Sequence, residues 1–305
     1  MVQVRVNRYP ATDSTTANDL GEKATYTVGK GGVNTSAMFR FNPGKQKIIF
    51  PETHPYFNNK EVVKKLSEQG KASDALINLK DFIKGDEPTN NEVKNILSKY
   101  AELSPDDFRQ GLDKVGFAKS RSYLMQHSMA YKPSTNEWVR GSKISISTHT
   151  FTIKIDGKLD TFNAADELKG ALGAIKKGEK LTFKQEYSVE SLWHEILHAK
   201  TKTKPTNFTN VTRQEMETVN QFVARHTYGD FLKRLGGTAQ HKDKILSDGL
   251  GYQRHVADFR KLLKDNGIDE TKAVEALQPK LLSNYGTIGR ETKKFINENK
   301  KKSED

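Results

Sequence analysis

The stretch SLWHEILHAK places His194, Glu195 and His198 in the order H-E-x-x-H. On a helix, the two histidines lie on one face and one turn apart. Their imidazoles could therefore supply two ligands to a tetrahedral Zn²⁺ ion. Glu195 is rotated away from that line, where it can reach an activated water without binding the metal. The spacing predicts a zinc site with Glu195 as the catalytic general base.

A catalytic zinc site needs a third protein ligand, with a fourth position left for water. The next predicted helix, residues 212–235, carries Glu215 and Glu217. Thr212 and Glu215 form a T-x-x-E capping box, which gives Glu215 a structural role at the helix start. Glu217 has no such role, so the sequence favours Glu217 as the third ligand and leaves Glu215 as the alternative.

At this point the chain resembles a known group of enzymes. The motif, and the eighteen residues between His198 and Glu217, are similar to the gluzincin branch of the zincin metallopeptidases. Over residues 180–235 the resemblance implies His194, His198 and Glu217 as zinc ligands and Glu195 as the residue that activates water. Gluzincins often have an asparagine before the third ligand. Met216 stands there in this chain, which keeps Glu215 open.

The pattern of the whole chain predicts an α+β fold. Residues 1–88 read as a β-rich N-terminal region with strands at 2–6, 24–29, 37–41 and 47–50 and a helix over residues 61–85, and the polar stretch 85–91 suggests a boundary. Residues 89–305 are predicted as a zincin-like metallopeptidase domain. It would contain a small mixed sheet, the H-E-x-x-H helix, the following ligand helix and a helical C-terminal part with breaks at 249–251, 267 and 279.

The elements around the motif follow from local signals. Residues 91–130 are expected to be helical, with a second helix starting at Ser104. The Asp156-Gly157 pair predicts a hairpin within residues 143–162, and a helix from residue 164 should end near Gly178. Residues 181–187 read as a strand that leads into the motif helix, with Ser188 as its N-cap. The resemblance to zincins implies that 181–187 is the edge that binds substrate by strand addition.

Composition restricts the chemistry. The chain has no cysteine, so any transition-metal site must use His, Asp and Glu. No apolar run is long enough to span a bilayer, and the opening residues lack the apolar core of a secretory signal. The net charge of +12 is spread along the 305 residues, which favours a solvated surface over a nucleic-acid interface. Nucleic acid therefore remains a less favoured partner.

A second resemblance concerns the chain as a whole. A zincin-like domain on a Lys- and Asn-rich chain, followed by ARHTYGDF and GLGYQRHVADFRKLL, is similar to zincin-like domains of phage head-morphogenesis and mobile-element proteins. This resemblance implies phage structural proteins as partners and a virion-associated or cytoplasmic location. Three functions are thus considered: a zinc metallopeptidase acting on peptides or proteins, a structural zincin-like protein, and a basic nucleic-acid-binding module.

Further polar residues beyond the motif were assigned from the sequence. The tetrahedral intermediate of peptide hydrolysis needs a donor for its oxyanion, and the candidates are His226, Tyr228, Tyr252 and His255. Histidines without ligand spacing are expected to be structural: His54, His127, His149 and His241. The Gly-rich stretch at 28–34 matches neither phosphate-binding pattern and predicts a turn.

Overall fold

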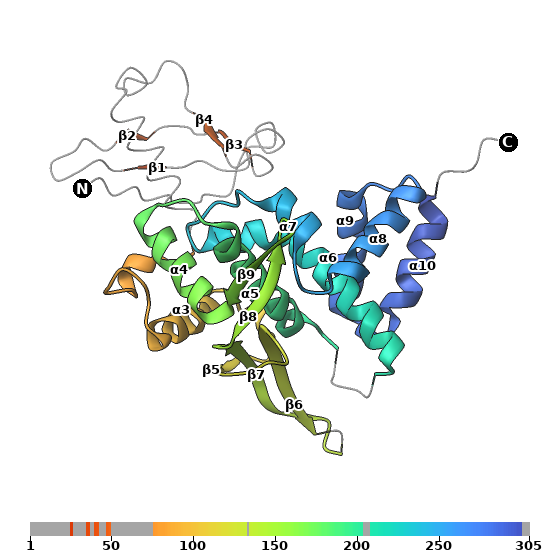
Figure 1. Cartoon of the computed structure of the whole chain (residues 1–305), viewed down its shortest axis with the longest axis horizontal. Helices are drawn as coiled ribbons and strands as arrows, with labels where there is room; N and C mark the ends of the chain where they lie inside the picture. Colours follow the sequence, from red (N-terminus) through yellow and green to blue (C-terminus); the bar gives the residue numbers. More distant parts are fainter. Residues whose placement is uncertain are drawn as a thin grey trace. The chain divides into compact units, whose positions relative to one another are not determined.

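The computed structural model describes residues 25–26, 35–36, 40–42, 47–49, 76–132, 134–203 and 208–300 (Figure 1). The chain divides into two compact units, Met1–Ala72 and Ser73–Asp305. Helices and small sheets both occur in the described residues, which confirms the mixed α+β class. None of the described helices combines the length and apolarity that a bilayer-spanning segment requires.

The first unit contains two short antiparallel pairs. Strand β1 (Thr25–Tyr26) pairs with β2 (Thr35–Ser36), and β3 (Arg40–Asn42) pairs with β4 (Lys47–Ile49). The predicted strands at 24–29, 37–41 and 47–50 each overlap one of these. The predicted strand at 2–6, the turn at 28–34, His54 and residues 61–75 of the predicted helix lie outside the described residues. The remainder of that predicted helix, residues 76–85, is wrong, because the structure has only the 3-10 turn η1 (Leu79–Asp81) there.

The second unit is built around a three-stranded sheet with the order β5-β7-β6, where β5 runs parallel and β6 antiparallel to β7. Because β6 pairs with β7 on one side only, it is an edge strand, and its other side lies beside helix α5. The hairpin β8–β9 follows. The bounds are β5 (Leu112–Ala118), β6 (Met125–Lys132), β7 (Glu137–Ser147), β8 (Thr150–Ile155) and β9 (Lys158–Asn163).

Two predictions in this region are wrong. The helix expected from Ser104 is only the 3-10 turn η2 (Pro105–Asp107), and most of residues 112–130 form β5 and β6 instead. Gly111 adopts a φ of 72°, which ends the turn and allows the chain to extend. Val115 is then buried against the core, as in a strand with one covered face.

Helices occupy most of the remaining second unit, and several have the ends that the sequence predicts. The helix near residues 91–104 is α3, the helix from residue 164 is α4, and Gly178 ends α4 with a φ of 74°. Asp156 and Gly157 form the turn of the β8–β9 hairpin. The bounds are η1 (Leu79–Asp81), α3 (Asn90–Leu103), α4 (Ala164–Lys177), α5 (Phe183–Lys200) and α6 (Asn210–Arg234).

Helix α5 begins earlier than predicted. Thr182 is its N-cap and forms a capping box with Gln185, whose amide donates to the Thr182 hydroxyl at 3.2 Å. Residues 183–187 are therefore helical, and the predicted strand at 181–187, with its role as a substrate edge, is wrong. Ser188 does not cap the helix, because its hydroxyl donates to the Ala164 carbonyl oxygen at 2.8 Å.

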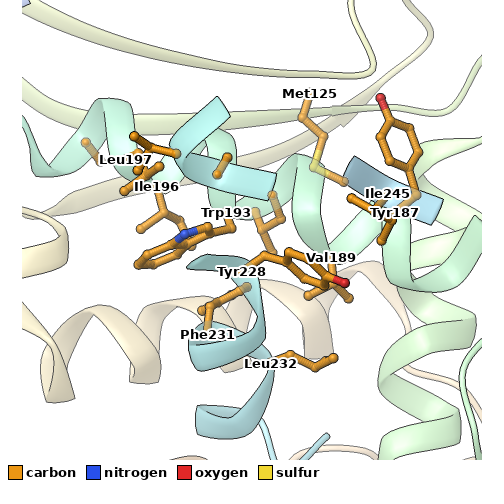
Figure 2. Close-up of a cluster of buried hydrophobic side chains, with 14 of the residues drawn as sticks. Met125, Tyr187, Val189, Trp193, Ile196, Leu197, Tyr228, Phe231, Leu232 and Ile245 are labelled. Carbon is orange, nitrogen blue, oxygen red and sulfur yellow. The ribbon is translucent and has the colours of Figure 1, made fainter. Parts of the chain in front are cut away.

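Helix α5 is buried on almost every side, because α4, α6 and β6 all pack against it. The apolar residues where α5 meets α6 form one cluster (Figure 2). In it the Trp193 ring stacks on Phe231 with centroids 5.2 Å apart, and its Nε1 donates to the Thr227 hydroxyl at 2.8 Å. This packing fixes how α5 is rotated relative to α6. It therefore also fixes where the side chains on the other faces of these two helices point.

Four further α-helices follow α6, and α8, α9 and α10 lie together beside it (Figure 1). The predicted breaks at 249–251 and 267 fall between these helices and are confirmed. The predicted break at Pro279 is wrong, since Pro279 lies inside α9. The bounds are α7 (Lys242–Asp248), α8 (Gln253–Asp265), α9 (Glu270–Ser283), η3 (Tyr285–Thr287) and α10 (Ile288–Asn299).

The segment before α3 belongs to the second unit. Ile77, Leu79 and Ile83 are buried in its core, and the Ile77 amide donates to the Arg234 carbonyl oxygen at 3.0 Å. The boundary predicted between residues 88 and 89 therefore lies inside this unit.

Candidate metal centre

Three potential ligands from two helices meet at one point. His194 and His198 lie one turn apart on α5, and their Nε2 atoms are 3.1 Å from each other. Glu217 of α6 brings its Oε2 atom to 3.2 Å from His194 Nε2 and 3.3 Å from His198 Nε2. The described residues contain this one cluster of three His, Asp or Glu side chains that could hold a metal ion.

The geometry of the three donor atoms fits a small tetrahedral ion. Ligand atoms at zinc–nitrogen and zinc–oxygen distances stand about 3.3 Å apart, close to the separations seen here. Glu217 Oε2 is buried and has no hydrogen bond of ordinary geometry among the described residues, although two imidazole nitrogens lie beside it. Two imidazoles and a carboxylate are also the donor set of many catalytic zinc sites.

The structure distinguishes Glu217 from Glu215 as candidates for the third ligand. Helix α6 begins at Asn210, and its N-cap is Thr209, whose hydroxyl accepts from the Thr212 amide at 3.1 Å. The predicted capping box of Thr212 and Glu215 is therefore wrong. Glu215 instead faces α10, where it pairs with Lys293 at 3.4 Å. Two residues along a helix turn the side chain by about 200°, so Glu215 and Glu217 point in nearly opposite directions.

Glu195 lines a cleft of about 940 Å³ together with the three potential ligands. Its side chain is largely buried, and its Oε2 atom accepts a hydrogen bond from the backbone amide of His127 in β6 at 2.7 Å. One carboxylate oxygen is thus fixed to the edge strand. The tether orients Glu195 in the cleft without placing it among the ligands.

Two polar residues that sequence analysis missed surround the ligands. His198 Nδ1 lies 3.0 Å from the Tyr285 hydroxyl, which also donates to the Leu197 carbonyl oxygen at 3.4 Å. Asn220 donates to the His194 carbonyl oxygen at 3.1 Å. Tyr285 comes from η3, far along the chain from the motif, so no local spacing could have identified it.

We expect Tyr285→Phe to lower zinc affinity by about 10–100-fold, because the Tyr285 hydroxyl orients the His198 ring from behind. Competition against a chromophoric chelator measures this affinity. Tyr228→Phe is the matched control, since Tyr228 is also buried but donates its hydroxyl to Glu186, away from the ligands. Equal zinc affinities of the two variants would show that the Tyr285 contact does not support the site.

Of the four predicted oxyanion donors, the structure brings only Tyr252 into the cleft. The Tyr252 ring stacks on His194, with centroids 6.0 Å apart and an interplanar angle of 15°. The other three have contacts elsewhere: His226 with Glu270, Tyr228 with Glu186 and His255 with Gln214. Tyr252 is thus the candidate donor that the geometry retains.

A buried arginine holds the loop that carries Tyr252. Arg225 of α6 is 1% exposed, and its Nη2 donates to the carbonyl oxygens of Gly249 and Gly251 at 2.6 and 2.7 Å. Its Nη1 donates to the Leu246 carbonyl oxygen at 3.2 Å. Tyr252 follows directly, with a φ of 51° that non-glycine residues seldom adopt. The loop conformation therefore depends on Arg225.

The histidines predicted to be structural differ in their surroundings. His127 lies at the site: its ring stacks on His198 at 6.3 Å, and its Nε2 is 3.0 Å from the Ser142 hydroxyl. Burial, together with the charge of His198, lowers the pKa of His127 to about 3, so the ring is neutral. His149 packs against Phe151, and His241 Nε2 contacts the Leu181 carbonyl oxygen, both away from the cluster.

The carboxylates control the protonation of the cluster when no metal is bound. Burial disfavours charge on His194, but its contact with Glu217 and the neighbouring carboxylates outweigh burial and raise its pKa to about 9. Burial likewise acts against charge on Glu217, yet the two histidines hold its pKa well below the usual range. Near neutral pH the metal-free site thus carries a proton on His194.

This proton predicts the pH dependence of zinc binding. A bound metal requires neutral imidazole, so a metal ion that binds here must displace the His194 proton at any pH below about 9. Affinity should rise about tenfold per pH unit up to that point. Folding raises the pKa of His194 from 6.5 to about 9. Protonated His194 therefore stabilises the metal-free fold, fully below pH 6.5, and this contribution is lost as the pH rises through 9. Titration calorimetry in two buffers counts the released proton; zinc binding without proton release would contradict the assignment.

Comparisons with protein-family models, curated proteins and solved structures found no match for this chain. Its function must therefore be inferred from the chemistry of the residues that the fold brings together. Those residues are a possible metal cluster of His194, His198 and Glu217, with Glu195 and Tyr252 in the same cleft.

Proposed function

We propose that this chain is a zinc-dependent metallopeptidase. His194, His198 and Glu217 would hold the ion, and Glu195 would act as the general base. The observation that carries the proposal is the convergence of three donor atoms, 3.1–3.3 Å apart, in a cleft that Glu195 also lines. A resident structural zinc would need a fourth protein ligand, and the cluster has three.

A zinc ion held there supplies Lewis acidity to a peptide carbonyl and to a water molecule. Glu195 takes the proton of that water as its oxygen attacks the carbonyl carbon. The same carboxyl group then delivers the proton to the leaving nitrogen when the C–N bond breaks. The His127 amide keeps one Glu195 oxygen fixed during both transfers, so the other oxygen is the one that exchanges the proton.

Tyr252 would stabilise the oxyanion that forms on the carbonyl. Burial and the nearby carboxylates Glu217 and Glu195 raise the pKa of Tyr252 above its usual value, so the hydroxyl keeps its proton. A protonated hydroxyl can donate a hydrogen bond to developing negative charge. The His194 ring, on which Tyr252 stacks, places this donor beside the potential ligands.

The edge strand β6 would bind the peptide. Residues 122–129, which include the first five residues of β6, line the cleft. An extended peptide can add to an open strand edge through backbone hydrogen bonds. This assignment replaces residues 181–187, of which 183–187 are helical, and would put the peptide along the strand that fixes Glu195.

Metal content tests the proposal. Purified protein equilibrated with zinc and then desalted should retain about one ion per chain, and His194→Ala and Glu217→Ala should lose it. Glu215→Ala is the matched control on the same helix and should keep it, because Glu215 faces Lys293. A wild-type protein that stays metal-free would contradict the proposal. Salt-sensitive DNA binding by that protein would then favour the nucleic-acid function.

A further inference from the structure

Arg213 stands one helical turn before Glu217 on α6. Residues four apart share a helix face, and Arg213 accordingly lines the same cleft as the potential ligands. The residue is exposed, and no carboxylate lies within ion-pair distance of its guanidinium in the part of the chain that the structure describes. Among the described residues, the cleft thus contains a cation that pairs with no carboxylate.

The surroundings of Arg213 differ from those of other arginines in the chain. Among the described residues that line the cleft, Arg213 is the one lysine or arginine. The neighbouring wall is apolar, with Phe208 and Met216 from the same region as Arg213. By contrast, Arg234 and Arg260 each pair with a carboxylate, Asp107 and Glu270 respectively.

The position of Arg213 relative to Tyr252 connects the cation to the reaction centre. Arg213 and Tyr252 line the same cleft, and Arg213 lies one helical turn from Glu217. The guanidinium therefore shares the cleft with the hydroxyl that would face the scissile carbonyl. A substrate group that meets Arg213 would lie near the bond that is cleaved.

We infer that Arg213 forms a carboxylate-binding subsite, so that the cleft selects peptides with a carboxylate close to the scissile bond. A guanidinium binds a carboxylate through two parallel hydrogen bonds. The carboxylate could be an acidic side chain or a free C-terminus, which share this chemistry. The inference rests on the proposed peptidase function and specifies its substrate class.

Cleavage of three mixtures of short random peptides tests the subsite. The first mixture contains Asp and Glu and has amidated C-termini, the second has Asn and Gln in their place, and the third is the second with free C-termini. Wild-type protein loaded with zinc should cleave the first or third about two- to fivefold faster than the second, since the subsite is solvent-exposed. Which of the two is preferred identifies the source of the carboxylate.

Variants assign this preference to Arg213. In Arg213→Gln the ratio of rates should fall to about one, in Arg213→Glu it should invert, and Arg213→Lys should keep a reduced preference. Lys233→Gln, an exposed cation at the other end of α6, is the control and should retain the wild-type ratio. High salt should weaken the preference by screening. A wild-type ratio of one, or an Arg213→Gln ratio equal to that of the wild type, would overturn the inference.

A binding experiment separates this inference from the proposed function. Zinc-loaded Glu195→Gln protein, immobilised, should retain the preferred carboxylate mixture over the neutral amidated one, and the added Arg213→Gln change should abolish the difference. If the wild type cleaves no mixture but retention still depends on Arg213, the peptidase proposal fails and the subsite stands. If cleavage occurs without any dependence on Arg213, the subsite fails and the peptidase proposal stands.

Discussion

Glu195→Gln should keep zinc bound and reduce peptide cleavage by about 10²–10⁴-fold, the usual contribution of a general base. Glutamine has the shape of glutamate, and its carbonyl oxygen can still accept the hydrogen bond from the His127 amide. The side chain therefore stays in place but cannot take a proton from water. Initial rates on a peptide library, with zinc content measured on the same samples, check both halves of this expectation.

Glu215→Gln is the matched control, because it makes the same chemical change on α6 at a residue that faces Lys293. It should cleave like the wild type. Undiminished cleavage by Glu195→Gln would contradict its role as the base. A wild-type protein that holds zinc and cleaves nothing across broad substrates would instead support a structural role for the site, the alternative suggested by the resemblance to phage and mobile-element proteins.

Arg225→Met should lower the free energy of unfolding by about 3–5 kcal/mol, the cost of removing one partner from a buried charged network. The change leaves the carbonyl oxygens of Leu246, Gly249 and Gly251 without their donor. It also removes a positive charge near Glu190, which is fully buried. Burial raises the pKa of Glu190 to about 7, although the charge of Arg225 opposes the rise. Urea unfolding followed by circular dichroism measures the loss.

Arg254→Met is the control for this variant. Arg254 lies on α8 with a side chain that is 91% exposed and makes one long contact, 3.9 Å, to Asp258. Its replacement should change the free energy of unfolding by no more than about 0.5 kcal/mol. If Arg225→Met does not fold, Arg225→Lys keeps the charge but not the forked donors, and should still destabilise. Equal stability of either Arg225 variant and the control would refute the role of Arg225 in holding this loop.

Local signals in the sequence were enough for those features that neighbouring residues determine. The Asp156-Gly157 turn and the end of α4 at Gly178 depend on backbone conformations that the residues themselves favour. The side-by-side placement of His194 and His198 follows from helical spacing alone. These predictions succeeded because each depends mainly on residues that are close together in the sequence.

Features that depend on distant contacts could not be predicted in the same way. Residues 112–118 form β5 because β7, residues 137–147, provides a parallel partner far along the chain. Likewise, Tyr285 reaches His198 only because η3 folds back onto α5. The choice between Glu215 and Glu217 depends on which face of α6 packs against α5, since Glu217 lies beside the two histidines whereas Glu215 pairs with Lys293.

The hydrogen bond from the His127 amide to Glu195 also determines how a peptide could be aligned on β6. Alternate residues of a strand direct their backbone groups to the same edge. The Leu124 carbonyl accepts from the Ser147 amide at 2.9 Å and so faces β7, whereas Met125 and His127 face the open edge. The His127 amide already donates to Glu195. A peptide added to this edge could therefore form hydrogen bonds with the amide and carbonyl of Met125 and with the carbonyl of His127. The peptide residues that pair with β6 would then alternate with residues that face away from it, so the scissile bond would keep one fixed position relative to the paired residues.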